Sequence, residues 1–91
     1  MGAWHRIGGL KVNPASMVGA VARNANTLDI FVIGKEGGVW TAAWTGGAWE
    51  SWMRVANGQA TSGSAVSAVS RAPGKLDIFV VGQDLGVWTA A

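Results

Sequence analysis

The sequence has no cysteine, no tyrosine, two prolines and few charged side chains. Without cysteine, the 91-residue chain can form neither a disulfide nor a thiolate metal site. Lysine and arginine exceed the acidic residues by only two and are scattered along the chain, so we expect no nucleic-acid partner. No apolar run approaches membrane-spanning length, and no basic-then-apolar segment opens the sequence. We therefore expect no membrane partner, and the compartment stays open.

The chain is rich in glycine and tryptophan, and it repeats itself. The segment from Leu28 to Trp44, LDIFVIGKEGGVWTAAW, occurs again from Leu76 to Ala91 as LDIFVVGQDLGVWTAA. With this offset of 48 residues, 1–43 align with 49–91 without a gap, and 19 positions are identical. A repeat of this length, made of short β-rich runs, falls near the range of propeller blades.

Short apolar and β-branched runs between turn residues predict an all-β chain. The complete unit, 16–55, has expected strands at 16–23, 28–33, 39–44 and 49–55. The second unit, 64–91, has expected strands at 64–71, 76–81 and 87–91. Residues 1–7 match 49–55 and supply one more strand. A helix over 28–33 is disfavoured because glycines interrupt the run within one or two turns.

This strand order places one outer strand at the wrong end of the chain. Residues 1–91 thus form two four-stranded antiparallel blades only if 1–7 completes the sheet of 64–91. Two blades leave apolar faces and strand edges bare, and such arrays generally need at least three repeats. We predict a β-propeller closed by homo-oligomerisation. Small side chains at 18–22 and 66–70, near the expected axis, favour four protomers over three.

The repeated motifs also resemble a known family. The pattern W–R–(I/V), (A/S)V-x-AV-x-R, LDIFV-x-G-x(3)-GVWTAAW and W-x-x-W resembles the repeats of Photorhabdus-type propeller lectins and their fungal and actinobacterial relatives. The resemblance covers both repeats. It implies a propeller whose glycan partners, fucose and O-methylated sugars, bind in pockets between blades. The chain departs from these lectins in having two repeats instead of about seven, and a short Thr45-Gly46-Gly47 turn.

Tryptophans are the main candidates for carbohydrate binding. An indole offers a broad apolar face to a sugar ring and one N–H donor. Arginine can donate hydrogen bonds to sugar hydroxyls. Packing between blades is the alternative role for each tryptophan. The predicted site consists of Trp44, Trp49, Trp52 and Arg54, together with Trp4 and Arg6, the repeat equivalents of Trp52 and Arg54.

No catalytic constellation, metal site or cofactor is indicated, so we predict a protein that is not an enzyme. His5 is the single histidine, and the other repeat has Met53 in its place. Glu36 and Asp84 are repeat equivalents in separate turns. They are therefore not the paired carboxylates that a glycosidase needs.

Two aspartates interrupt apolar strands, and each follows an arginine by six residues. Asp29 follows Arg23, and Asp77 follows Arg71. A carboxylate among apolar strand residues is costly unless a partner or backbone donors compensate it. We expect each pair to meet across its hairpin in a structural role.

Two functions stay open on the sequence. One is a non-enzymatic, carbohydrate-binding, self-assembling propeller. The other is a designed or reconstructed propeller scaffold that assembles but binds no ligand.

Overall fold

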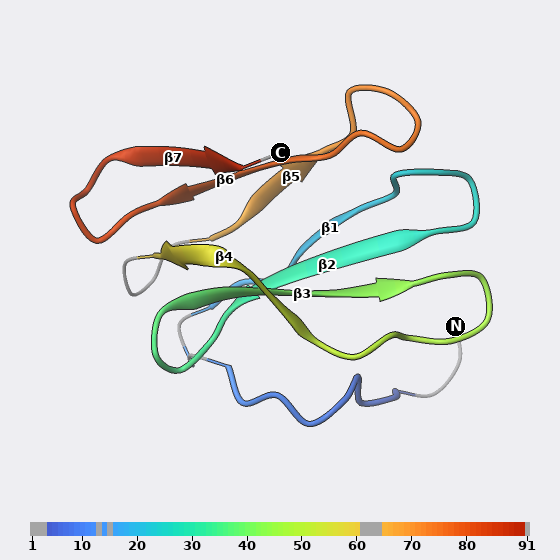
Figure 1. Cartoon of the computed structure of the whole chain (residues 1–91). Helices are drawn as coiled ribbons and strands as arrows, with labels where there is room; N and C mark the ends of the chain where they lie inside the picture. The colour runs from blue at the N-terminus through green and yellow to red at the C-terminus, as the bar shows by residue number, and fades with distance from the viewer. Residues whose placement is uncertain (1–3, 13, 15, 61–64, 91) are drawn as a thin grey trace.

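The computed structural model describes residues 4–12, 14, 16–60 and 65–90, and all the regular elements in these ranges are β-strands (Figure 1). The all-β prediction is therefore confirmed. The strands are β1 (Gly19–Val21), β2 (Leu28–Ile33), β3 (Gly38–Trp44), β4 (Met53–Gln59), β5 (Ser67–Val69), β6 (Asp77–Val81) and β7 (Val87–Ala90).

The strands form two antiparallel sheets in which spatial order follows chain order. One sheet is β1-β2-β3-β4 and the other is β5-β6-β7. The sequence repeat is also a structural repeat, because Gly19 lies opposite Phe31 in the first sheet and Ser67 lies opposite Phe79 in the second. The tight turns after β2 and β6 correspond as well. In both, the glycine at the start of the turn donates its N–H to the glycine four residues later, at 2.8 Å.

The two sheets are stacked, and their first strands lie closest together (Figure 1). Gly19 is the first residue of β1, and a Cβ atom added to it would overlap the carbonyl oxygen of Val66. A side chain there would therefore push the sheets apart. Apolar side chains from both sheets fill the space between them, which removes them from water and stabilises the stack. The buried cluster consists of Phe31, Ile33, Val39, Ala60, Val66 and Ile78.

The structure corrects the predicted bounds of the outer strand. We expected a strand at 49–55, but β4 runs over Met53–Gln59. Trp49 instead forms an isolated bridge with Trp44 across the 45–48 turn, which delays the start of the next full strand. The expected strands at 16–23, 64–71, 76–81 and 87–91 are shorter, at 19–21, 67–69, 77–81 and 87–90. Ser64 and Ala91 lie outside the described residues.

Within the single chain, residues 4–7, the described part of the strand predicted at 1–7, form no strand. The predicted pairing of this segment with the sheet of 64–91 stays a prediction. Residues 1–3 lie outside the described residues. The segment 4–12 runs beside the first sheet without joining it (Figure 1). A strand needs a sheet edge to pair with. Segment 4–12 is bridged to the first sheet only near its end, where Val12 pairs with Gly34.

The N-terminal segment nevertheless has the backbone course of β4. Gly8 has φ of 61°, and Ala56, which lies 48 residues later, has φ of 46°. The Val12–Gly34 bridge likewise has a counterpart 48 residues later, between Ala60 and Gly82. Residues 4–12 therefore lie against the first sheet as β4 and Ala60 lie against the second.

Both expected ion pairs are confirmed. Arg23 Nε lies 2.6 Å from Asp29 Oδ2, and Arg71 Nε lies 2.6 Å from Asp77 Oδ2. The side chain of Asp29 is 7% exposed and that of Asp77 is 16% exposed. Each pair joins the loop after the first strand of its sheet to the second strand, so it closes the hairpin and neutralises the aspartate.

Candidate functional site

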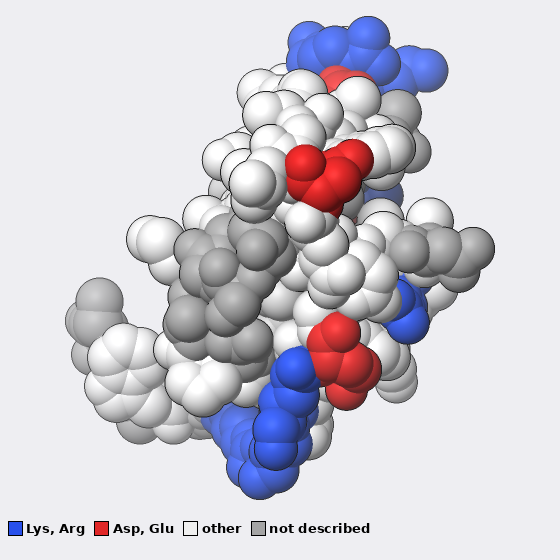
Figure 2. Space-filling model, turned by 90° about the vertical axis from the view of Figure 1, so that its left-hand side faces the viewer, with Lys and Arg blue, Asp and Glu red and all other residues white. Residues whose placement is uncertain are grey.

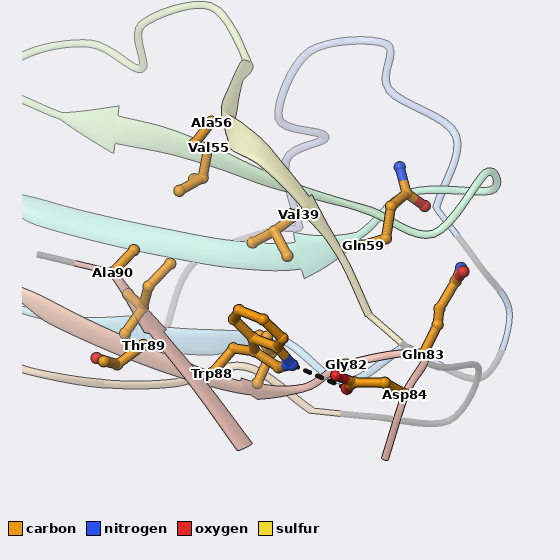
Figure 3. Close-up of a pocket in the computed structure, with 13 residues that line it drawn as sticks. Val39, Val55, Ala56, Gln59, Gly82, Gln83, Asp84, Trp88, Thr89 and Ala90 are labelled. Atoms are coloured by element: carbon orange, nitrogen blue, oxygen red, sulfur yellow. Dashed lines mark hydrogen bonds between the residues drawn. The ribbon is translucent and has the colours of Figure 1, made fainter. Parts of the chain in front are cut away.

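A pocket of about 350 Å³ lies between the outer parts of the two sheets (Figure 3). Its upper wall in Figure 3 comes from Val39 on β3 and Val55 on β4. Its lower wall comes from β6, β7 and the turn between them. Most of the lining is apolar, and a few polar groups gather at one end. This is the usual character of a small-molecule binding site.

Trp88 is the aromatic residue of the pocket, and its indole is held by the adjoining turn. The indole Nε1–H donates to Asp84 Oδ1 at 2.9 Å, and the Gly86 amide donates to the same oxygen at 2.9 Å. The hydrogen bond from Trp88 is the main cause that lowers the pKa of Asp84 below its ordinary value of 3.8, and the Gly86 amide adds to it. Trp88 is 58% exposed, so one indole in a fixed orientation is available to a ligand.

A glycine beneath the indole makes this orientation possible. A Cβ atom on Gly82 would stand 2.6 Å from Cδ1 and Nε1 of Trp88, so any other residue would displace the ring. The first sheet repeats the arrangement, with Gly34 beneath Trp40 at 2.7 Å by the same measure. The glycines that follow β2 and β6 therefore serve ring packing as well as the tight turns.

Hydrogen-bonding groups lie at the Asp84 end of the pocket. The amides of Gln59 and Gln83 are on the same side as the Asp84 carboxylate, and Thr89 lies toward the other end (Figure 3). Amides both donate and accept, whereas a carboxylate accepts. Figure 2 shows this side of the molecule with charged atoms in small separate groups, not in one field of a single sign. Such a pocket suits an uncharged ligand with hydroxyl groups and an apolar face.

A smaller hollow of about 220 Å³ adjoins the core nearer the first strands. Arg23 and Asp29 line it together with apolar residues such as Phe31 and Leu76. Since these two charged groups already pair with each other, this hollow offers a ligand less than the Trp88 pocket does.

The predicted tryptophan group lies elsewhere. Trp44 and Trp49 face each other across the β3–β4 turn, and both are half-buried. Trp52 is half-buried, and its Nε1–H donates to the carbonyl oxygen of Ile7 at 2.9 Å. Arg54 on β4 lies opposite Trp40 and donates to the Gly58 carbonyl oxygen at 3.4 Å. None of these four predicted residues lines the Trp88 pocket.

Trp4 and Arg6, the other predicted site residues, lie in the N-terminal segment. Both are exposed, and Trp4 is 96% exposed. They do not line the Trp88 pocket either. The structure therefore does not bring the six predicted residues together into one cavity.

Sequence reasoning missed the residues that do form the pocket. The available signal was the repeat itself. An acidic residue precedes the repeated tryptophan by four positions in both copies, as Glu36 before Trp40 and Asp84 before Trp88. We interpreted Asp84 as a turn residue. It does accept from the Gly86 amide within the turn, and the same oxygen orients the indole.

Within the described residues, no group of three or more His, Asp or Glu side chains could hold a metal ion. The same ranges contain no helix that is long and apolar enough to span a membrane. Comparison of the chain with protein-family models, with curated proteins and with solved structures found no match.

Proposed function

We propose that the chain is a non-enzymatic carbohydrate-binding protein and that its copies assemble into a closed β-propeller. The observation that carries the binding proposal is the half-exposed, hydrogen-bonded indole of Trp88 in the inter-sheet pocket. A sugar ring presents an apolar C–H face that stacks on indole, and its hydroxyls exchange hydrogen bonds with amides and carboxylates. Gln83 and Asp84 supply those groups at one end of the same cavity.

The Asp84 carboxylate has a second use in this proposal. It holds the indole through one oxygen, Oδ1. Its other oxygen is an additional acceptor for a sugar hydroxyl. We expect fucose and O-methylated sugars to be suitable probes, since the repeat motifs resemble those of lectins with that preference.

The assembly proposal rests on the unpaired edge of the second sheet. The first sheet has four strands and the second has three, so β7 has no neighbour on its outer edge among the described residues. An exposed edge is a template for pairing with another chain. Residues 5–11 match β4, Met53–Gln59, at the repeat offset and share its positive φ position. They are the strand that would complete the second sheet of another copy.

Repetition of the same strand pairing and sheet stacking from copy to copy would close a ring. Residues 4–12 already lie against the first sheet as β4 lies against the second, so each copy carries the outer strand of a preceding blade. Adding whole chains gives an even number of blades. The close approach at Gly19 leaves little space between neighbouring first strands, and we propose four protomers instead of three.

Substitution of Trp88 by Ala tests the binding proposal, and Trp44→Ala is its control. Trp44 forms the bridge with Trp49 at the end of the β3–β4 hairpin and does not line the pocket. By analogy with base–aromatic stacking, loss of the indole costs about 1–3 kcal/mol, or roughly 5- to 150-fold in affinity. We expect calorimetric titration with fucose or its methyl ethers to show this loss for Trp88→Ala and unchanged affinity for folded Trp44→Ala. Equal effects of the two substitutions would contradict the assignment of the site.

The alternative function is a self-assembling scaffold without a ligand. The N-terminal segment supports it, because its β4-like course favours assembly whether or not the pocket binds anything. A chain of ring mass that binds none of these sugars at millimolar concentration, by calorimetry and by tryptophan fluorescence, would favour the scaffold and contradict a lectin for these sugars.

A further inference from the structure

The contact between Trp52 and the N-terminal segment shows how one outer strand meets the next. Trp52 precedes β4, and its Nε1–H donates to the Ile7 carbonyl oxygen at 2.9 Å. The ring also covers Gly8, where an added Cβ atom would stand 2.8 Å from the indole Cδ1. This tryptophan thus closes the gap between the first sheet and the β4-like segment beside it.

The positions one repeat, or 48 residues, after Ile7 and Gly8 lie in the pocket. Ile7 and Gly8 become Val55 and Ala56, and both of these line the Trp88 pocket. The residue that would take the place of Trp52 would lie 48 positions further on, beyond Ala91. The tryptophan in the equivalent position of the other repeat is Trp4.

We propose that Trp4 of a second copy covers Val55 and Ala56, donates its Nε1–H to the Val55 carbonyl oxygen and adds a second indole to the Trp88 pocket. This inference rests on the assembly in the proposed function. It makes the binding site incomplete in a single chain, because one of its two aromatic walls comes from the neighbour.

The register of β4 fixes where this second indole stands. Arg54 lies opposite Trp40 and Met53 lies opposite Thr41. With residues 5–11 of another copy in the same register on β7, Arg6 lies opposite Trp88 and His5 lies opposite Thr89. Trp4 then leads into the strand at the Ala90 end of β7, beside the pocket.

The exposure of the free chain agrees with this arrangement. Trp4 is 96% exposed and Val87, on the unpaired edge, is 78% exposed. Burying a large indole and completing a strand edge both favour association. One association would bury both surfaces.

Chemical cross-linking tests the contact directly, because the chain has no cysteine of its own. The variant W4C/A56C is treated with a short bis-maleimide and analysed on a denaturing gel. We expect covalent dimers and higher products that join neighbouring copies. The matched control is W52C/G8C, whose two positions are in contact within one chain, so its cross-link should keep the monomer mass.

The result separates this inference from the proposal on which it depends. If native mass shows a ring but W4C/A56C gives no intermolecular product while W52C/G8C cross-links, Trp4 lies elsewhere and the inference is wrong. If the native mass is that of one chain, the assembly itself fails and the inference fails with it.

A sugar titration then tests whether Trp4 belongs to the site. Trp4→Ala should bind fucose or its methyl ethers at least fivefold more weakly while the ring mass persists. Trp4→Phe, which keeps an aromatic face, should recover part of the affinity. An assembled Trp4→Ala variant with unchanged affinity would show that the second indole does not touch the ligand.

Discussion

Replacement of Arg23 by Met should destabilise the chain far more than the same change at Arg71. Both arginines place Nε 2.6 Å from a carboxylate on the second strand of a sheet. They differ in the exposure of the pair. Asp29 and Arg23 have side-chain exposures of 7% and 34%, whereas Asp77 and Arg71 have 16% and 65%. The two ion pairs thus have the same geometry with different access to solvent.

The expected loss of stability on removing the arginine lies between the values for a fully buried and an exposed ion pair. Removal of one partner from a fully buried pair costs about 3–5 kcal/mol, because a charge is left without compensation. An exposed pair contributes about 0–1 kcal/mol. Since Arg23 is about one-third exposed, water relieves part of the penalty at Asp29, and we expect a loss of about 2 kcal/mol for Arg23→Met. For Arg71→Met we expect about 1 kcal/mol or less.

Urea unfolding followed by tryptophan fluorescence measures both losses. With a slope of about 1–3 kcal/mol per molar urea, Arg23→Met should lower the midpoint by about 1 M. All variants must be compared at one protein concentration, because association contributes to apparent stability. The double change Arg23→Met and Asp29→Asn should recover part of the loss. Equal midpoints for Arg23→Met and Arg71→Met would refute the argument from burial.

Three further predictions concern the backbone, the pocket and the N-terminus. Ala56 and Leu85 have φ of 46° and 68°, and the other repeat has glycine at both positions. Ala56→Gly and Leu85→Gly should therefore each raise the free energy of unfolding by about 1 kcal/mol. Unchanged or lower urea midpoints would contradict this. Because folding lowers the pKa of Asp84, its charged form is stabilised by the fold, and this contribution is present above the ordinary value of 3.8 and is lost as pH falls through the lower folded value. Trp88 fluorescence should therefore stay constant from neutral pH down to 3.8 and change only below it, and a similar acid transition in Asp84→Asn would assign the change to another group. Deletion of residues 1–7 should prevent assembly by removing part of the strand for β7, and sedimentation of the shortened chain as an intact ring would exclude the proposed strand exchange.

Much of the fold could be predicted because each strand and turn pattern occurs in both copies of the repeat. The apolar runs and turn glycines occur in both copies, and β2 was predicted with its observed bounds. The Arg–Asp pairs could also be predicted, since a carboxylate in an apolar strand needs a nearby partner and only the hairpin offered one. The residues in these contacts belong to one hairpin. Their separation along the sequence therefore predicts that they meet.

The start of β4 and the location of the pocket could not be derived from spacing. Trp49 and Trp52 continue an alternating pattern, but the Trp44–Trp49 bridge turns the first of them into part of the hairpin end. The pocket depends on which outer strands face each other across two sheets. The role of Trp88 also depends on the hydrogen bond that holds its indole on Asp84. The packing of one sheet on the other and the Trp88–Asp84 hydrogen bond are tertiary contacts. Neither of them leaves a mark on the hydrophobic pattern of the sequence.

Native mass spectrometry of the intact chain at micromolar concentration tests the central claim most directly. One chain has a mass of 9.4 kDa, and the proposed ring of four copies has four times that mass, about 38 kDa. A discrete species near 38 kDa is the predicted result. A species near 28 kDa, three times 9.4 kDa, would keep the ring but contradict the proposed number of protomers. A folded species of 9.4 kDa alone would contradict the assembly and the shared site together.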